Sequence, residues 1–451
     1  MSTERRATDS VCKNNRRKST PIGGGERDKK DNSFKKTKKL VIAGNRSAER
    51  GKPSATVQSP SGETPDNGVF NPEEKLHQKE IVLDESQKSH LAKLARQIIG
   101  DGIPKLTEEY EGIAKYKPPH LTRETQDAHK KQCRYKDVNC WDQTRIKLNF
   151  PPDIENDFIH ANYVTHPLFK NKFICTQGPM EHTILEFWRL VWQENVVVVI
   201  MLCQCLELKR PKCAQYWPTV VNTPKTVGPF TITTDNIDTV TDPNVVYTEL
   251  KLEYGGTAKK VEHHHWITWP DKTVPKNGTV AFKLLVHPRY YTCSPSIIHC
   301  SAGVGRTGTL LMLELLIQHI VNLKQPSIPD LLKELRAQRS QLIQTEDQYV
   351  FMHAAMVQYA VLQKAVSFGE CNKFFHHYTT YVKHFAAETD AKNKARKARK
   401  PATKARKAHE DTVDKDKEKE KDKPGGLRGF LENFTKEKEE KYNDDSDSVR
   451  K

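Results

Sequence analysis

One stretch, residues 296–309 with the sequence S-I-I-H-C-S-A-G-V-G-R-T-G-T, constrains the fold more than any other part of the chain. It begins with a short apolar run that is typical of a buried strand and continues through a loop that contains glycines. Residues 309–323 follow and are apolar on almost every side, which is the pattern of a helix enclosed within a domain. The stretch therefore predicts a strand, a tight loop and an enclosed helix in immediate succession.

The predicted loop is suited to hold an anion. Gly303 and Gly305 let its backbone N–H groups point inward, and the start of the helix adds a positive dipole end. Cys300 stands at its base, and the guanidinium fork of Arg306 matches two oxygens of a phosphate. These surroundings stabilise a thiolate, which is the nucleophilic form of cysteine. The Cys-x5-Arg spacing alone favours a structural cysteine and a surface arginine, but the longer string between strand and helix favours a cysteine that attacks phosphorus.

The formal charge of +16 is concentrated at the two ends of the chain. Residues 1–60 carry 16 basic and 6 acidic side chains, residues 391–451 carry 20 and 14, and the remainder is neutral. Both ends lack apolar periodicity, so residues 1–80 and 391–451 are predicted to be disordered tails. Any binding to nucleic acid or an anionic membrane belongs to these tails, although neither shows aromatic residues interleaved for base stacking.

The region between the tails reads as an ordinary globular domain. Leu91, Leu94 and Ile98 have the spacing of an amphipathic opening helix, residues 196–200 read as a buried strand and residues 246–252 as an alternating one. Residues 366–390 are expected to form a further helix. No run approaches the eighteen apolar residues of a membrane span, and the ten cysteines without an export signal are expected to be reduced thiols. We therefore expect a cytoplasmic or nuclear protein.

The stretch around Cys300 resembles the signature of the protein-tyrosine phosphatases, in their phosphotyrosine-specific, non-receptor branch, and the resemblance extends over residues 84–365. It implies an α/β fold with a highly twisted mixed sheet flanked by helices. It also implies hydrolysis of phosphotyrosine in proteins through a cysteinyl-phosphate, with tyrosine-phosphorylated proteins as partners and no cofactor. Cys300 matches the nucleophile, and the phosphate-binding positions match Ser301, Ala302, Gly303, Val304, Gly305 and Arg306.

A second match is Trp269-Pro270-Asp271, upstream of the cysteine. In the family this motif is the first part of a mobile lid, and Asp271 matches the general acid that protonates the leaving tyrosine oxygen. Lys272 and Thr273 stand where the family usually has Phe and Gly. The change removes an apolar cover over the substrate ring, so slow or selective turnover is one expectation for this chain.

A third match is the segment that begins Arg134-Tyr135-Lys136-Asp137 and resembles the substrate-recognition loop of the family. Tyr135 is expected to stack on the substrate ring and to set the depth of the cleft, so that only a long aryl phosphate reaches the cysteine. Asp137 is expected to accept hydrogen bonds from the substrate main chain. Cys133 and the pair Cys140-Trp141 depart from the usual Asn and Pro-Tyr.

The remaining matches concern water and support. The resemblance assigns the positioning of the hydrolytic water to Gln344, with Gln348 nearby as a substrate-binding residue, and assigns to Thr307 a hydroxyl that donates to the leaving thiolate. Arg336 and Arg339 are expected to brace the loop rather than to touch substrate. Four supporting positions complete the set: His299, Tyr216, Glu207 and Lys212.

Two groups of residues suggest a metal but favour structural roles. His263, His264 and His265 are consecutive, and residues on one strand alternate faces, so all three cannot ligate one ion. Cys203 and Cys205 lack a second pair at finger spacing. We therefore predict no metal. Two other functions stay open: a catalytically weak phosphotyrosine-binding module, and a scaffold whose basic tails bind nucleic acid or anionic surfaces.

Overall fold

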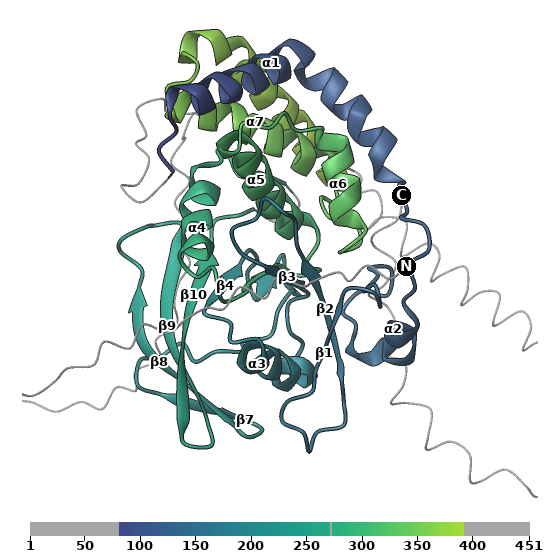
Figure 1. Ribbon diagram of the computed structural model, residues 1–451, viewed down its shortest axis with the longest axis vertical. Helices are drawn as coiled ribbons and strands as arrows, with labels where there is room; N and C mark the ends of the chain where they lie inside the picture. Colours follow the sequence, from purple (N-terminus) through teal and green to yellow (C-terminus); the bar gives the residue numbers. More distant parts are fainter. Residues whose placement is uncertain (1–80, 271–272, 392–451) are drawn as a thin grey trace, which may run out of the picture. The chain divides into compact units, whose positions relative to one another are not determined.

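The computed structural model describes residues 81–270 and 273–391. Within it, nine strands form one sheet in the order β1-β2-β3-β11-β4-β10-β9-β8-β7 (Figure 1). Their bounds are β1 (Arg145–Lys147), β2 (Phe158–Val164), β3 (Phe173–Thr176), β4 (Val198–Met201), β7 (Pro224–Val227), β8 (Phe230–Asp238), β9 (Val245–Tyr254), β10 (Thr257–Trp266) and β11 (Ser296–His299). A two-stranded sheet consists of β5 (Leu206–Glu207) and β6 (Arg210–Pro211).

The sheet is parallel at its centre and antiparallel towards both edges. β11 pairs in parallel with β3 and β4, and β4 pairs in parallel with β10. β1–β2, β2–β3 and the meander β7–β10 are antiparallel. Central strands covered on both faces have to be apolar throughout, and every residue of β3, β4 and β11 is buried. The sheet is mixed and twisted, as predicted.

Helices cover both faces of this sheet, which confirms the predicted α/β class. Figure 1 shows α1, α5, α6 and α7 packed together on one side of the sheet and α3 on the other. The helices are α1 (Glu85–Ala114), α2 (Glu124–Ala128), α3 (Ile184–Gln193), α4 (Thr279–Tyr290), α5 (Gly305–Val321), α6 (Ile328–Arg336) and α7 (Glu346–Leu362), with short 3-10 turns η1 (Lys130–Gln132) and η2 (Glu181–Thr183). α5 is buried over almost its whole length and begins four residues before the predicted position.

Two helices close the described chain at its ends. α1 buries Leu91, Leu94 and Ile98, as the spacing predicted, and Asp84 caps its N-terminus by accepting from the Gln87 N–H. Residues 368–391 form a helix. Its Tyr381 hydroxyl donates to Glu346 of α7 at 2.8 Å. The chain segments before and after the sheet therefore meet the same helical layer.

Among the helices of residues 81–270 and 273–391, none has the length and apolar character needed to cross a membrane. The predicted disordered tails, residues 1–80 and residue 392 onward, lie outside the described residues. Asp271 and Lys272 also lie outside them.

Candidate active site

The sheet places Cys300 directly after its central strand. β11 ends at His299, Cys300 follows, and α5 begins at Gly305, so residues 300–305, here called the cysteine loop, join the strand to the buried helix. Cys300 is only 5% exposed. The backbone N–H of Gly303 donates to the Cys300 sulfur over 3.3 Å. The sulfur therefore accepts from a main-chain N–H group of the loop, close to the positive end of α5.

Glycine is required at position 303 by conformation and by space. Its φ of +68° lies in the left-handed region that side chains disfavour. A Cβ there would lie 2.0 Å from the carbonyl oxygen of Thr176. The neighbouring chain is held by a backbone hydrogen bond of 2.9 Å from Gly178 N–H to the Ser301 carbonyl. The cysteine loop thus packs backbone against backbone on the end of β3.

Arg306 is fixed by a buried carboxylate. Its guanidinium donates to both oxygens of Glu207, at 2.5 and 3.1 Å, and to the Leu202 carbonyl at 2.8 Å. Burial acts to lower the pKa of Arg306, but the hydrogen bond and charge of Glu207 outweigh it and raise the pKa. The guanidinium is therefore a permanent positive charge beside the cysteine loop.

Arg339 braces the cysteine loop through two of its carbonyl groups, as expected. It is fully buried and donates to the carbonyls of Ala302 and Gly303, at 3.0 and 3.2 Å. The expectation was wrong for Arg336, whose guanidinium instead donates to the carbonyls of Ile113, Leu342 and Ile343. Arg336 is the last residue of α6, and its guanidinium ties the end of α1 to the segment that precedes Gln344.

A buried chain of polar side chains lies behind Cys300. The Tyr216 hydroxyl lies 2.8 Å from Nε2 of His299 and 2.7 Å from Nε2 of His263. Since Nδ1 of His299 lies 3.2 Å from the Cys300 carbonyl and has to donate to it, Nε2 accepts from Tyr216, and His263 donates to the Tyr216 oxygen. Burial lowers the pKa of His299 to about 3, so the ring is neutral. His263 was not predicted to join this group.

The predicted recognition loop lies against the cysteine loop. The Tyr135 hydroxyl is 2.9 Å from the Ser301 hydroxyl, and Ser301 in turn donates to the Lys212 carbonyl at 2.9 Å. The Asp137 carbonyl accepts from Gln341 at 2.6 Å. Tyr135 therefore lies against the cysteine loop and Lys212 reaches it through its main chain, whereas the contact of Asp137 is to Gln341.

Arg134 holds this arrangement and was missed as a supporting residue. Its guanidinium donates to the carbonyls of Gly178 and Pro179, at 3.0 and 2.7 Å, and its backbone N–H donates to the Gln177 side chain. Gln177 returns the contact by donating to the Gln132 carbonyl. The sequence offered one indication of this role: Arg134 directly precedes Tyr135. A side chain that contacts the substrate ring has to be held in place, and the residue next to it in the chain can do so.

Both predicted glutamines lie next to the start of α5. The side-chain oxygen of Gln348 accepts from the Gln344 backbone N–H at 3.0 Å and lies beside Gly305. A Cβ at Gly308 would lie 2.4 Å from the Ile343 nitrogen, so only glycine lets this segment approach the helix so closely. The Thr307 hydroxyl is buried and has no hydrogen-bond partner within the described residues.

The lid motif is described only in part. Trp269 is buried, packs on the Trp266 ring at 4.7 Å between centroids and donates to the Thr273 carbonyl. The Pro270 carbonyl lies 3.4 Å from the Arg306 guanidinium. The first residues of the lid motif therefore lie next to Arg306, which follows the cysteine loop. The predicted general acid Asp271 and its neighbour Lys272 lie outside the described residues.

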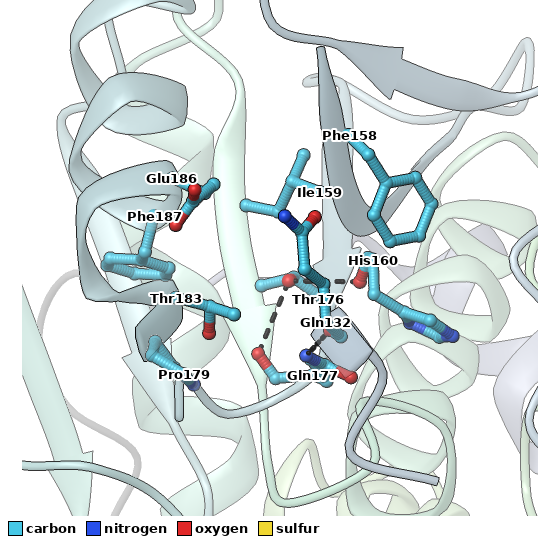
Figure 2. A pocket seen from close by; sticks show the side chains of 10 residues that line it. All are labelled: Gln132, Phe158, Ile159, His160, Thr176, Gln177, Pro179, Thr183, Glu186 and Phe187. Atoms are coloured by element: carbon cyan, nitrogen blue, oxygen red, sulfur yellow. Dashed lines mark hydrogen bonds between the residues drawn. The ribbon is translucent and has the colours of Figure 1, made fainter. Parts of the chain in front are cut away.

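A small hollow lies behind the recognition loop. Figure 2 shows side chains from β2, η2 and α3 around it, with the end of β3 at its floor. Three buried atoms in its wall lack a hydrogen-bond partner within the described residues: Gln132 Oε1, His160 Nδ1 and Glu186 Oε2. Groups of this kind are commonly satisfied by a buried water. The hollow thus offers buried polar atoms that a water can satisfy.

Comparison with known protein families identifies relatives of the described region. The family model described as "Protein-tyrosine phosphatase" matches residues 129–358. The chain is 34% identical over 251 residues to human tyrosine-protein phosphatase non-receptor type 12, which covers 53% of this chain. It is 35% identical over 268 residues to the receptor-type tyrosine-protein phosphatase eta of Gallus gallus, which covers 57% of this chain. These segments make up 31% and 19% of the two relatives, so the chain spans about a third or less of their lengths.

The fold is similar to a solved structure as well. The catalytic domain of human protein tyrosine phosphatase non-receptor type 18 superimposes with a TM-score of 0.52 and 28% sequence identity. The superposition covers 61% of this chain and 100% of that domain. The sheet, the cysteine loop and the helices around them thus have a counterpart of known structure.

Proposed function

Because the chain belongs to the protein-tyrosine phosphatase family, we propose that it hydrolyses phosphotyrosine in proteins with Cys300 as the nucleophile. The main support is the place of the Cys300 sulfur, which accepts from the Gly303 N–H at the start of the buried helix α5. Backbone N–H groups of the cysteine loop and the Arg306 guanidinium supply positive charge where the phosphate oxygens bind. The substrate class is tyrosine-phosphorylated proteins.

In the first step, the Cys300 thiolate attacks phosphorus. The S–P bond forms as the bond from phosphorus to the tyrosine oxygen breaks, and Asp271 gives its proton to that oxygen. Arg306, held by Glu207, stabilises the charge that develops on the phosphate oxygens. The proximity of the Pro270 carbonyl to Arg306 supports placing Asp271, the next residue, near this site.

In the second step, water hydrolyses the cysteinyl-phosphate. Gln344 orients the water with Gln348 beside it, and Asp271, now ionised, accepts its proton as the P–S bond breaks. Thr307 donates to the departing sulfur, a role that its buried hydroxyl without a partner in the described residues supports. These steps use only side chains and main-chain groups of this chain.

We expect selectivity for phosphotyrosine over phosphoserine to follow from the depth of the cleft above Cys300. The Tyr135 hydroxyl contacts Ser301 of the cysteine loop, so the Tyr135 ring forms a wall above the sulfur. A phosphoserine is too short to pass such a wall, whereas an aryl phosphate reaches the base and lays its ring along Tyr135. Cytoplasmic or nuclear location stays a prediction from the sequence.

The test is turnover of a phosphotyrosyl peptide by the full chain and by its Cys300→Ser variant. Loss of the nucleophile is expected to lower kcat by about 10⁵-fold or more. Cys293→Ser is the matched control, because Cys293 is exposed and its variant is expected to retain wild-type kcat. Retention of full activity by Cys300→Ser would overturn the proposed nucleophile.

Single-turnover measurement separates hydrolysis from the alternative of a binding module. Release of phosphate from a phosphotyrosyl peptide within one turnover supports the enzyme, and binding without release supports the module. The Asp271→Ala variant is expected to hold substrate proteins from a cell extract without releasing them. The scaffold alternative rests on the tails and is tested by deleting residues 1–75 and 391–451, since unchanged salt-dependent binding to nucleic acid would contradict it.

A further inference from the structure

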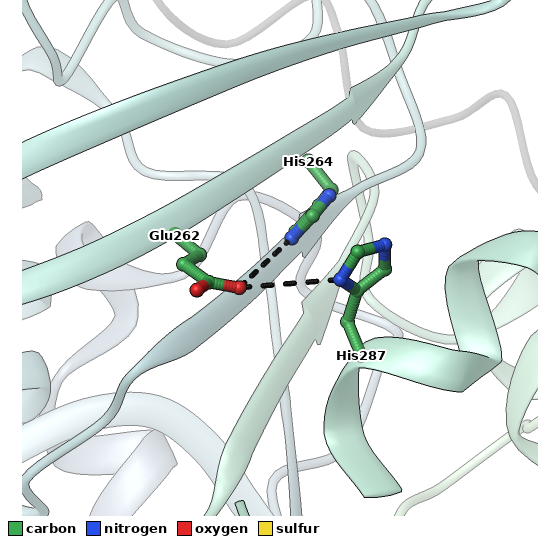
Figure 3. Close-up of side chains that lie close together, drawn as sticks. All are labelled: Glu262, His264 and His287. Atoms are coloured by element: carbon green, nitrogen blue, oxygen red, sulfur yellow. Dashed lines mark ion pairs between the residues drawn. The ribbon is translucent and has the colours of Figure 1, made fainter. Parts of the chain in front are cut away.

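Glu262 and His264 of β10 meet His287 of α4 on the face of β10 opposite to the one from which His263 contacts Tyr216. Figure 3 shows one carboxylate oxygen facing both imidazole rings, which lie against each other with their centroids 3.9 Å apart. Oε2 of Glu262 lies 3.6 Å from Nε2 of His264 and 4.0 Å from Nδ1 of His287. One ligand atom from each of the three residues lies within 4.8 Å of the others. Two imidazole nitrogens and a carboxylate oxygen therefore lie close enough together for one ion to reach all three after side-chain rotation.

The ring nitrogen of His264 that faces the carboxylate is unsatisfied. His264 is 2% exposed, and its Nε2 has no hydrogen-bond partner within the described residues, since 3.6 Å is too long for one. The carboxylate is also held in place, because its other oxygen accepts from the Tyr291 hydroxyl at 2.6 Å. A fixed carboxylate oxygen and a buried ring nitrogen thus lie close together with no hydrogen bond between them.

The set of donor atoms favours a transition metal over the hard cations. Zn²⁺ binds His nitrogen and carboxylate oxygen at about 2.0–2.2 Å, which places tetrahedral ligands about 3.3 Å apart. Small rotations of the side chains would close the observed 3.6 and 4.0 Å to that spacing. Ca²⁺ and Mg²⁺ prefer several oxygen ligands, and this cluster offers one carboxylate.

We propose that Glu262, His264 and His287 form a binding site for Zn²⁺ or a similar transition-metal ion. A water completes the coordination on the open side, where the His287 side chain is 38% exposed and gives the ion access. Three consecutive histidines still cannot share an ion; only His264 contributes, and the other ligands come from the same strand face and from α4. The site does not depend on the proposed phosphatase activity.

Metal binding here would cross-link two elements that flank the lid motif. β10 ends at Trp266, and α4 begins at Thr279. Trp269 and Pro270 belong to the chain that runs between these elements, and Pro270 contacts Arg306. An ion held by both elements would fix β10 relative to α4 and would slow local opening of either.

The test measures Co²⁺ and Zn²⁺ binding to the full chain. Co²⁺ at this site is expected to give the visible bands of a tetrahedral nitrogen–oxygen site, without the sulfur-to-cobalt band that cysteine ligands produce. His287→Ala is the main variant because its partly exposed side chain can be removed without opening the core. It is expected to lose these bands and to bind more than about 100-fold more weakly, since changes outside the ligand shell already cost about 10–100-fold.

Two further measurements keep the result interpretable. His384→Ala is the matched control: His384 lies 3.4 Å from Glu388 and is 74% exposed, and it belongs to no three-ligand cluster within the described residues. It is expected to bind Co²⁺ as the wild type does. Zn²⁺ is expected to slow hydrogen exchange in β10 and α4 of the wild type but not of His287→Ala. Equal Co²⁺ affinity and spectra in the wild type and His287→Ala would overturn the site.

Discussion

The two faces of β10 carry the same residue type into opposite surroundings. His263 and His265 point towards one face, here called the Tyr216 face, where His263 contacts the Tyr216 hydroxyl and His265 contacts the Cys203 carbonyl. His264, between them, points towards α4 and meets Glu262 and His287. A strand turns successive side chains to opposite faces, so one run of three histidines serves two unrelated sites.

The difference shows what decides the chemistry of a buried histidine. On the Tyr216 face the imidazoles bond to a hydroxyl and a carbonyl and, among the residues that the structure describes, to no carboxylate. The rings therefore stay neutral and act as hydrogen-bonding supports. On the α4 side a carboxylate and a second imidazole lie close by, and part of the cluster reaches solvent. A buried histidine among neutral groups serves as a hydrogen-bonding support, whereas a buried histidine beside a carboxylate can help to hold a cation.

The largest expected difference between the faces concerns two glutamates. Glu207→Gln removes the charge that pairs with Arg306, which is buried, and leaves the guanidinium without a counter-charge. The free energy of unfolding is expected to fall by about 3–5 kcal/mol. Turnover of a phosphotyrosyl peptide is expected to fall by about 100-fold, because Arg306 loses its fixed orientation. Urea unfolding and steady-state kinetics measure these two effects.

Glu262→Gln on the α4 face is the matched change. In metal-free protein it is expected to leave turnover unchanged and to lose Co²⁺ binding, since its carboxylate contacts His264, His287 and Tyr291 and not the cysteine loop. Equal losses of turnover in the two variants would remove the distinction between the faces.

A smaller difference is expected for two tyrosines. Tyr216→Phe removes the hydroxyl that joins His263 and His299 and leaves one buried donor and one buried acceptor unpaired. The expected loss is about 2–4 kcal/mol of unfolding free energy, at about 1–3 kcal/mol for each unpaired group. Tyr247→Phe on the α4 face loses one weak contact, 3.4 Å to Glu249, and is expected to cost less than about 1 kcal/mol. Urea unfolding of both variants checks the order, and a larger loss for Tyr247→Phe would reverse the comparison.

The smallest effect per residue concerns pH. Burial lowers the pKa of His299 and of His160 to about 3 each. Below about pH 6.5 the unfolded chain binds protons at these rings and the folded chain does not, so stability falls as pH falls from about 6.5 towards 3. At pH 5 each ring is expected to cost about 2 kcal/mol relative to pH 7.5.

His160→Gln is the variant that isolates one of these rings. Its amide can still donate to the Val138 carbonyl, which His160 Nε2 contacts at 3.0 Å. Urea unfolding at pH 7.5 and 5.0 is expected to show about 2 kcal/mol less loss than in the wild type. An identical pH dependence in the two proteins would mean that His160 is not held neutral in the folded state.

Much of the site could be predicted because its parts are local in sequence. The order Ser296 to Thr309 predicts the strand, the loop and the enclosed helix, and all three are present as β11, the cysteine loop and α5. The bracing role of Arg339 was also predictable once the loop was identified. Arg336 lies three residues earlier on the same chain, but the end of α6 turns its guanidinium to Leu342 and Ile343. Sequence spacing could not show that divergence.

The sequence by itself determined the class of fold, the cysteine loop and the family, because strand–loop–helix order and glycine positions act through the local backbone. Only the tertiary structure decided which distant side chains meet: Glu207 with Arg306, Tyr216 between His263 and His299, and His287 with Glu262 and His264. Those meetings depend on strand pairing and on how α4 packs against β10. Such contacts between residues far apart in the chain are set by the packing of the whole core, and no local pattern encodes them.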